Sequence, residues 1–313
     1  KDLLETFDFI GFIGNPYLKP EYSDQYEINY SRPIPMGFAN VNIFYNEVSN
    51  YCSELITKKY STSFSLGINT LHKSIHKYIY NIYGFVRFAD EIVDTFHDLD
   101  KKRVLDEFEK DTFQSIKNKF STNPVLHSFQ MVVNKFNIDD KHIKAFLDSM
   151  RMDLTMKKFS VEEYKNYIYG SAEVVGLMCL KVFCDNEDKY NQLEPYAISL
   201  GSAFQKINFL RDIKSDNEER GRVYFPGVDY NTFSITEKIE IEEDIEKDFN
   251  HALIGIKKLP SVARSGVYLS YNYYRELLNK IKLLDAEKLK EERIRVSNFK
   301  KFIIFLSSYI NPL

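Results

Sequence analysis

The stretch QKINFLRDIKSD, residues 205–216, predicts both a helix and a chemical site. Gln205, Asn208, Asp212 and Asp216 follow one another at intervals of three, four and four residues. Side chains at these intervals lie on one face of an α-helix, so the four form a stripe about three turns long. All four carry oxygen donors, which hard cations such as Mg²⁺ prefer. The stripe therefore indicates a metal-binding helix face, and the alternative is a solvated polar face.

A second stretch, RFADEIVD at residues 87–94, places Asp90 and Asp94 four residues apart, with Arg87 on the same helix face. Two carboxylates at this interval repel each other unless a cation lies between them. Taken alone, the pair also fits two solvated acids on a charged helix. Two such helix faces with Mg²⁺, or Mn²⁺ in its place, between them would bind a diphosphate and neutralise it as a leaving group.

Residues that interrupt helices are scarce and unevenly distributed. Gly accounts for 12 and Pro for 9 of the 313 residues, and four of the nine prolines fall within the first forty. From about residue 41 the apolar residues recur at helical spacing, and the best strand candidate is the short run 222–225. We therefore predict an irregular N-terminal arm at residues 1–40 and an all-α domain at residues 41–313.

The boundaries of the helices follow from the apolar spacing and from capping residues. Ser160 with Glu163 three residues later forms a capping box, which predicts a helix that begins at residue 161. Residues 218–234 contain two glycines and a proline and form the clearest internal loop. The predicted helices span residues 42–58, 71–97, 101–120, 124–135, 139–156, 161–183, 189–217, 236–257, 261–283 and 297–310.

Composition excludes several classes of protein. The net charge of −3 gives no electrostatic reason to expect a nucleic-acid partner. The three cysteines, Cys52, Cys179 and Cys184, form neither a disulfide framework nor a zinc motif, so we expect reduced thiols. No apolar run reaches the ~18 residues of a membrane span, and no signal peptide is evident, which favours a cytoplasmic protein. The apolar run 302–306 fits a core helix or a membrane-surface contact.

From about residue 45 to residue 310, the ordered motifs resemble those of the squalene and phytoene synthase family. The stretch 87–94 resembles its first aspartate motif, and 208–216 with the run 220–226 resembles its second. The helix at 167–176 resembles its central Tyr-x-x-x-x-Ala-x-x-Val-Gly segment. The other corresponding positions are Ser61, Ser63 and Phe64 in the segment 60–65, then Asp153, Tyr274 and Arg293.

The resemblance implies a single-domain class I isoprenoid synthase helical bundle with a central cavity. It implies catalytic roles for Asp90, Asp94, Asp212, Asp216 and Tyr167, and metal ligation by Asp90, Asp94, Asn208, Asp212 and Asp216. It implies substrate contacts from Ser61, Ser63, Phe64, Arg87, Gln205, Asn208, Arg222, Tyr224, Tyr274 and Arg293. Tyr60 stands where several relatives have His, and either Arg220 or Arg222 could fill one arginine position, which the sequence leaves open.

The implied reaction joins two identical prenyl diphosphates head to head through a cyclopropylcarbinyl diphosphate. Two geranylgeranyl diphosphates would give phytoene, whereas two farnesyl diphosphates would give dehydrosqualene or, with NADPH, squalene. The resemblance places Ile68 and Tyr80 in the tunnel for the substrate tail. Ile68 is smaller than the Phe of a C30-type relative, which favours the longer substrate and phytoene, so NADPH is not expected.

A third interpretation belongs to another class: a non-catalytic helical relative that binds lipid or assists assembly. All four aspartates, with Arg87 and Asn208, are present, which argues against it.

An allylic cation needs a dry cavity with aromatic walls, and the 22 Tyr and 25 Phe residues can supply one. An apolar product also implies peripheral membrane contact for its release, whereas the sequence indicates no oligomeric state.

Overall fold

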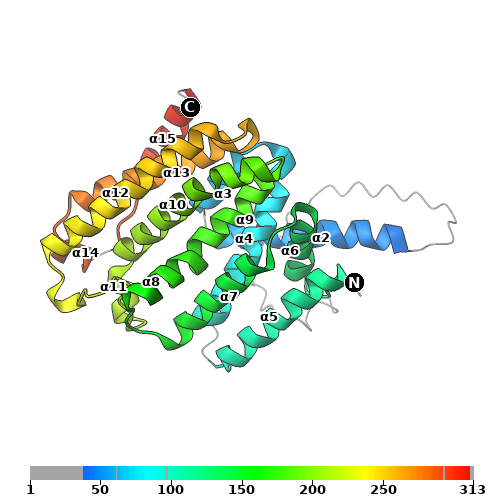
Figure 1. The fold of residues 1–313 in the computed structure, drawn as a ribbon, viewed down its shortest axis with the longest axis horizontal. Helices are drawn as coiled ribbons and strands as arrows, with labels where there is room; N and C mark the ends of the chain where they lie inside the picture. Colours follow the sequence, from blue (N-terminus) through cyan, green and yellow to red (C-terminus); the bar gives the residue numbers. More distant parts are fainter. Residues whose placement is uncertain (1–37, 61, 96–97, 292, 311–313) are drawn as a thin grey trace. The chain divides into compact units, whose positions relative to one another are not determined.

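Helices form nearly all of the regular structure in the computed structural model, which describes residues 38–60, 62–95, 98–291 and 293–310 (Figure 1). The chain divides into two units at Ala39 and Asn40, and the unit Asn40–Leu313 carries the helices below apart from the first two residues of α2. The predicted irregular arm lies outside the described residues, except for its last three, which begin α2. In order, the elements are α2 (Phe38–Tyr60), α3 (Thr62–Asn69), α4 (Lys73–Asp94), α5 (Lys101–Asn118), α6 (Pro124–Phe136), α7 (Asp140–Thr155), α8 (Val161–Ile168), the π-helix η2 (Tyr169–Glu173), α9 (Val174–Phe183), α10 (Glu187–Arg211), α11 (Ile213–Glu218), the 3₁₀-helix η3 (Tyr230–Thr232), α12 (Ile235–Lys258), α13 (Ser261–Lys282), α14 (Ala286–Leu289) and α15 (Asn298–Ile310).

Side-chain caps set several of these boundaries where the sequence predicts them. The Ser160 hydroxyl accepts from the Glu163 backbone N–H, and the Glu163 carboxylate accepts from the Ser160 N–H, which confirms the capping box at α8. Ser234 and Glu237 repeat the arrangement at α12. Each box satisfies backbone donors that the first helical turn leaves without partners.

Three predicted helices differ from the observed ones, each for a local reason. The range 161–183 is interrupted by the π-helical segment Tyr169–Glu173, a single wider turn between two α-helical segments. The predicted helix 189–217 is interrupted at Asp212, whose dihedral angles (φ −104°, ψ 9°) are not those of an α-helix. The range 71–97 ends early, at Asp94. The proposed strand 222–225 makes only an isolated bridge, between Val223 and Lys158.

A stack of phenylalanine rings fixes α4 against its neighbours. The Phe85 ring lies parallel to that of Phe129 on α6, with centroids 3.9 Å apart. It also contacts Phe108 on α5 and Phe146 on α7, with centroids 5.5 and 5.6 Å away. Phe85 is fully buried, and burial of such a ring contributes about 1.5–3 kcal/mol. The stack therefore holds the end of α4 that carries Asp90 and Asp94.

The central element is α10, which packs against α12 on one side and against η2 and α9 on the other (Figure 1). Between these helices lies a cavity of about 790 Å³, with walls from α3, α4, α9, α10, α12, α13 and α15. The cavity is within the usual size range of ligand pockets. Ile68 lines it, as predicted, but Tyr80 does not. The Tyr80 hydroxyl instead donates to Asn69 Oδ1 (3.2 Å) at a separate surface depression. The neighbouring residue Ile79 lies in the cavity wall, where Tyr80 was expected.

Among the described helices, none combines the length and the apolar character that a membrane span requires. The predicted cytoplasmic location stays a prediction. The exposed large apolar side chains are distributed over several helices and the turns between them, with four of them on α15.

Gly170 tests whether the π-helical segment depends on a close approach to α7. A Cβ at Gly170 would lie 2.4 Å from the Ala145 carbonyl oxygen and 2.7 Å from Ser149 Cβ. Gly170→Ala should lower the free energy of unfolding by about 1–3 kcal/mol in urea denaturation, because backbone must move. Gly176→Ala on the following helix is the matched control, since its Cβ would meet its nearest atom at 3.4 Å. Equal stability of the two variants would contradict this close packing.

Candidate active site

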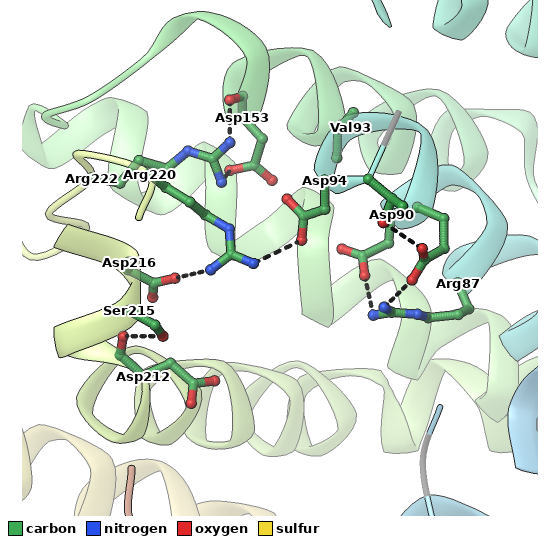
Figure 2. A network of polar contacts seen from close by, with 12 residues as sticks. Arg87, Asp90, Val93, Asp94, Asp153, Asp212, Ser215, Asp216, Arg220 and Arg222 are labelled. Atoms are coloured by element: carbon green, nitrogen blue, oxygen red, sulfur yellow. Dashed lines mark hydrogen bonds and ion pairs between the residues drawn. The ribbon is translucent and has the colours of Figure 1, made fainter. Parts of the chain in front are cut away.

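The two aspartate stretches meet across one end of the helical bundle (Figure 2). Asp90 and Asp94 lie on the last turns of α4, and Asp216 lies on α11 opposite them. Arg220 lies between the two sides, with Nη2 3.4 Å from Asp94 Oδ2 and Nη1 3.3 Å from Asp216 Oδ1. Residues more than a hundred positions apart in sequence therefore form one acidic site.

Burial raises the pKa of two of these carboxyl groups. Asp90 has a pKa of about 7, mainly because surrounding protein disfavours its charge, and Asp94 adds repulsion while Arg87 opposes the shift. Asp216 has a pKa of about 7 for the same reason, with repulsion from Asp212. The Asp90 side chain keeps 32% exposure, so solvent or a cation can still reach it. Such a site gains electrostatically when a cation binds.

Asp212 lies at the joint between α10 and α11, where two arginines hold it. Arg211 donates to Asp212 from Nε (3.0 Å) and Nη2 (2.5 Å). Arg293 Nε lies 2.7 Å from Asp212 Oδ1. Arg211 and Arg293 both line the cavity, so positive charge borders the acidic site on the cavity side. This pairing of cations with carboxylates suits a metal-bound diphosphate, which carries negative charge of its own.

Hydrogen bonds connect the amides of the α10 stripe to the cavity wall. Asn208 Nδ2 donates to Gln205 Oε1 (3.2 Å), and Gln205 Nε2 donates to Ser171 Oγ (3.2 Å). The Tyr274 hydroxyl donates to Asn208 Oδ1 (3.3 Å). The Tyr274 ring stacks on Phe204 with centroids 3.9 Å apart. All five side chains line the cavity, so the predicted residues Gln205, Asn208 and Tyr274 form one continuous polar and aromatic wall.

Asp153 is the centre of a buried cluster beside the acidic site. It accepts hydrogen bonds from the hydroxyls of Tyr167 (2.8 Å) and Tyr224 (3.0 Å) and pairs with Arg222 Nη1 (3.2 Å). Burial raises its pKa to about 6 although Arg222 opposes the shift. Burial also raises the pKa of the Tyr167 hydroxyl, so that group stays protonated. The Tyr224 ring stacks on Phe209 of α10 with centroids 4.2 Å apart, which fixes the cluster to the helix that carries Asn208.

The structure separates the roles of Arg220 and Arg222, which the sequence leaves open. Gly221 between them has φ 65°, a left-handed conformation that favours glycine. The Arg222 backbone N–H donates to the Asp216 carbonyl (2.8 Å), which turns the chain back toward α11. Arg220 therefore reaches the two opposed aspartates, whereas Arg222 reaches Asp153.

The donor set fits a hard cation that shares its coordination sphere with a ligand. In the described ranges no three His, Cys, Asp or Glu side chains approach closely enough to hold a metal ion by themselves. The available donors are carboxylate and amide oxygens, and burial, with added repulsion from Asp94 and Asp212, raises the pKa values of Asp90 and Asp216. Mg²⁺ typically takes one or two carboxylates and completes its sphere with phosphate oxygens and water.

Some predicted positions remain untested, and some contacts were not predicted. Ser61 lies outside the described residues, and Ser63 and Phe64 lie on α3 with side chains that are not described. Arg211 and the Arg87–Glu91 pair were missed. Both could have been found from adjacency, because Arg211 precedes Asp212 and Glu91 lies one helical turn after Arg87.

Comparison with known proteins agrees with this geometry. The family described as "Squalene/phytoene synthase" matches residues 57–300, which is most of the chain. The chain therefore belongs to the squalene/phytoene synthase family. It is a prenyltransferase of the type that joins two prenyl diphosphates head to head.

Individual relatives have low sequence identity to this chain but align with most of it. Phytoene synthase 1, chloroplastic, from Solanum lycopersicum is 28% identical over 323 residues, which cover 93% of this chain and 74% of the relative. The 4,4'-diapophytoene synthase of Staphylococcus haemolyticus is 23% identical over 275 residues, covering 82% and 94%. A solved dehydrosqualene synthase with a bound ligand matches with a TM-score of 0.74 and 22% identity, over 85% of this chain and 96% of that one. The last comparison confirms the predicted all-α isoprenoid synthase fold.

Asp153→Asn tests the buried cluster through the pH dependence of stability. The pKa of Asp153 is about 6 in the folded protein, against a reference value of 3.8. The folded wild type therefore retains a proton that the unfolded chain releases, and this stabilisation is lost as pH rises through about 6. Urea denaturation should show the unfolding free energy of wild type minus variant falling by roughly 2 kcal/mol between about pH 4 and pH 7. A difference that does not change with pH would contradict the assignment.

Proposed function

We propose that this protein condenses two geranylgeranyl diphosphates to phytoene through a cyclopropylcarbinyl diphosphate, in a Mg²⁺-dependent reaction. The observation that carries the proposal is the junction of a long cavity with an acidic site. Arg211, Asn208 and Arg293 lie at the cavity end of that junction, and Asp212 contacts both arginines. A prenyl diphosphate has this division, with a charged head and an apolar tail.

The head would bind at the acidic site. Asp90 and Asp94 from α4, with Asn208, Asp212 and Asp216 from α10 and α11, would supply the protein's oxygen ligands to Mg²⁺ or Mn²⁺. When bound, the cation neutralises the diphosphate leaving group. Arg87, Arg211, Arg222 and Arg293 contribute positive charge that diphosphate oxygens can share. Arg220 lies between the two acidic sides and would supply a further positive charge to the bound diphosphate.

The cavity would protect the cation left by ionisation. Tyr83, Phe204 and Tyr274 line it, and aromatic faces stabilise a nearby cation by about 0.5–2 kcal/mol each. Apolar side chains of α9 and α12 exclude water, which would otherwise quench the cation. Tyr167 keeps its proton because burial raises its pKa, and with Tyr224 it orients Asp153 beside the reacting groups.

The choice of substrate rests on the size of one side chain in the cavity wall. Ile68 lies in the wall, and a branched aliphatic side chain there leaves more room than an aromatic ring would. The main alternative is farnesyl diphosphate as substrate with dehydrosqualene or squalene as product. The similarity to a 4,4'-diapophytoene synthase supports this alternative. We expect no requirement for NADPH.

Product analysis distinguishes these substrates. The purified protein is incubated with Mg²⁺ and either the C20 or the C15 diphosphate, with and without NADPH, and the hydrocarbons are identified by mass spectrometry. We expect phytoene from the C20 substrate, no effect of NADPH, and no product when EDTA removes the metal. A C30 hydrocarbon from the C15 substrate and nothing from the C20 one would contradict the choice of substrate.

Asp90→Asn and Asp212→Asn test the metal-binding role. Each should lower turnover by at least about a hundredfold, because metal ligation contributes several kcal/mol to stabilisation of the leaving group. Circular dichroism should show that both variants remain folded. The control is Asp188→Asn, an exposed residue in the first turn of α10. Wild-type turnover in either site variant would exclude the metal role.

A thermal-shift measurement on wild type tests the non-catalytic interpretation. Absence of a Mg²⁺-dependent shift with a diphosphate analogue would favour the interpretation that the protein is a non-catalytic relative.

A further inference from the structure

The C-terminal helix α15 has two apolar faces. Its inner face packs on α13, where Asn272 Nδ2 donates to Ser308 Oγ (3.0 Å), and Ile304 is buried. Its outer face is a stripe of four large side chains at intervals of three, one and three residues, which place them on one side of the helix. Their exposed fractions are 74% for Phe299, 56% for Phe302, 41% for Ile303 and 39% for Leu306.

The segment that carries this stripe is basic in sequence. From residue 293 to residue 313 the sequence contains Arg293, Arg295, Lys300 and Lys301 and no acidic residue, although the whole chain has a net charge of −3. Lys300 contacts Glu276 on α13 at 3.3 Å and keeps 43% exposure. A helix with an apolar face bordered by basic residues has the character of helices that lie in the interface of an anionic bilayer.

The same segment forms part of the cavity wall. Ile294, Val296 and Ile304 line the cavity, together with Asn298 and Lys301. Residues 294–296 alternate between buried and exposed, so Ile294 and Val296 turn inward while Arg295 faces solvent. The outer stripe is thus separated from the cavity by the thickness of one helix.

We propose that the outer face of α15, formed by Phe299, Phe302, Ile303 and Leu306, docks on an anionic lipid bilayer. The helix lies in the plane of the interface, its apolar stripe enters the acyl boundary, and the exposed side chains of Arg295 and Lys300 contact lipid headgroups. In the reaction proposed above, on which this step rests, the hydrocarbon product passes from the cavity along α15 into the bilayer without crossing water.

Vesicle binding tests the surface directly. The full-length protein is sedimented with phosphatidylcholine vesicles that contain or lack phosphatidylglycerol. We expect wild type to bind the anionic vesicles more tightly than the neutral ones. The double variant Phe299→Ser/Phe302→Ser should bind anionic vesicles about tenfold or more weakly, because two phenyl rings no longer enter the apolar phase. The control is Ile239→Ser/Ile254→Ser on α12, whose side chains are 45% and 47% exposed. It should bind like wild type.

Further measurements separate the alternatives. Thermal melting should be unchanged in both double variants, because all four side chains are exposed. Turnover in detergent should be unchanged in Phe299→Ser/Phe302→Ser, since neither residue lines the cavity. Vesicle binding that is absent in wild type, or equal in wild type and the α15 variant, overturns the proposal. So does light scattering that shows a dimer lost in that variant without vesicle binding, which would make a second copy the occupant. A protein that binds vesicles through α15 but forms no hydrocarbon would refute the proposed function alone.

Discussion

Repulsion between carboxylates across one end of the bundle is the constraint on which the rest of the structure depends. Two unit charges at 4 Å repel by about 4 kcal/mol at an effective dielectric constant of 20. The protein's own groups limit this cost in two ways. Arg220 lies between Asp94 and Asp216, and burial raises the pKa of Asp90 and Asp216 to about 7, so part of the charge is neutralised by protons. A cation that entered the site would release those protons, so occupancy of the site by metal depends on pH.

A site with such internal repulsion requires rigid support. The stacked rings around Phe85 hold α4, and the stack of Phe209 on Tyr224 holds the return loop against α10. Asp153 links these two sides, because its carboxylate binds Tyr167 from α8 and Arg222 from the loop. Removal of one partner would leave a buried charge without compensation, which costs more than the pair contributes to stability. The cluster thus fixes the geometry of the site rather than adding much net stability.

The helical fold and the aspartate faces could be predicted from the sequence because they depend on local spacing. Intervals of three and four residues assigned Asn208, Asp212 and Asp216 to one helix face. The break at Asp212 could not be predicted, because it coincides with bonds to Arg211 and to Arg293, eighty-one residues away. The partners of Arg220 and Arg222 depend on the left-handed conformation of Gly221 and on α7, which are tertiary features. Tyr80 was misplaced because a shift of one residue turns a helical side chain by about 100°.

The π-helical segment explains how the helical run from α8 to α9 contributes side chains both to the Asp153 cluster and to the cavity wall. Ala172 at the end of η2 and Val175, Gly176 and Cys179 of α9 follow the three- and four-residue spacing of a straight helix face and line the cavity. Ser171 also lines the cavity, directly beside Ala172, which a regular helix would turn away by about 100°. The wider π-turn at Tyr169–Glu173 brings both to the cavity, and Tyr167, just before it, faces Asp153 instead. Ser171 Oγ donates to the Tyr167 carbonyl (2.7 Å) and accepts from Gln205, so the turn connects the buried cluster to the polar end of the cavity. The close contact of Gly170 with α7 fixes the position of this turn, since a Cβ at Gly170 would lie 2.4 Å from the Ala145 carbonyl oxygen.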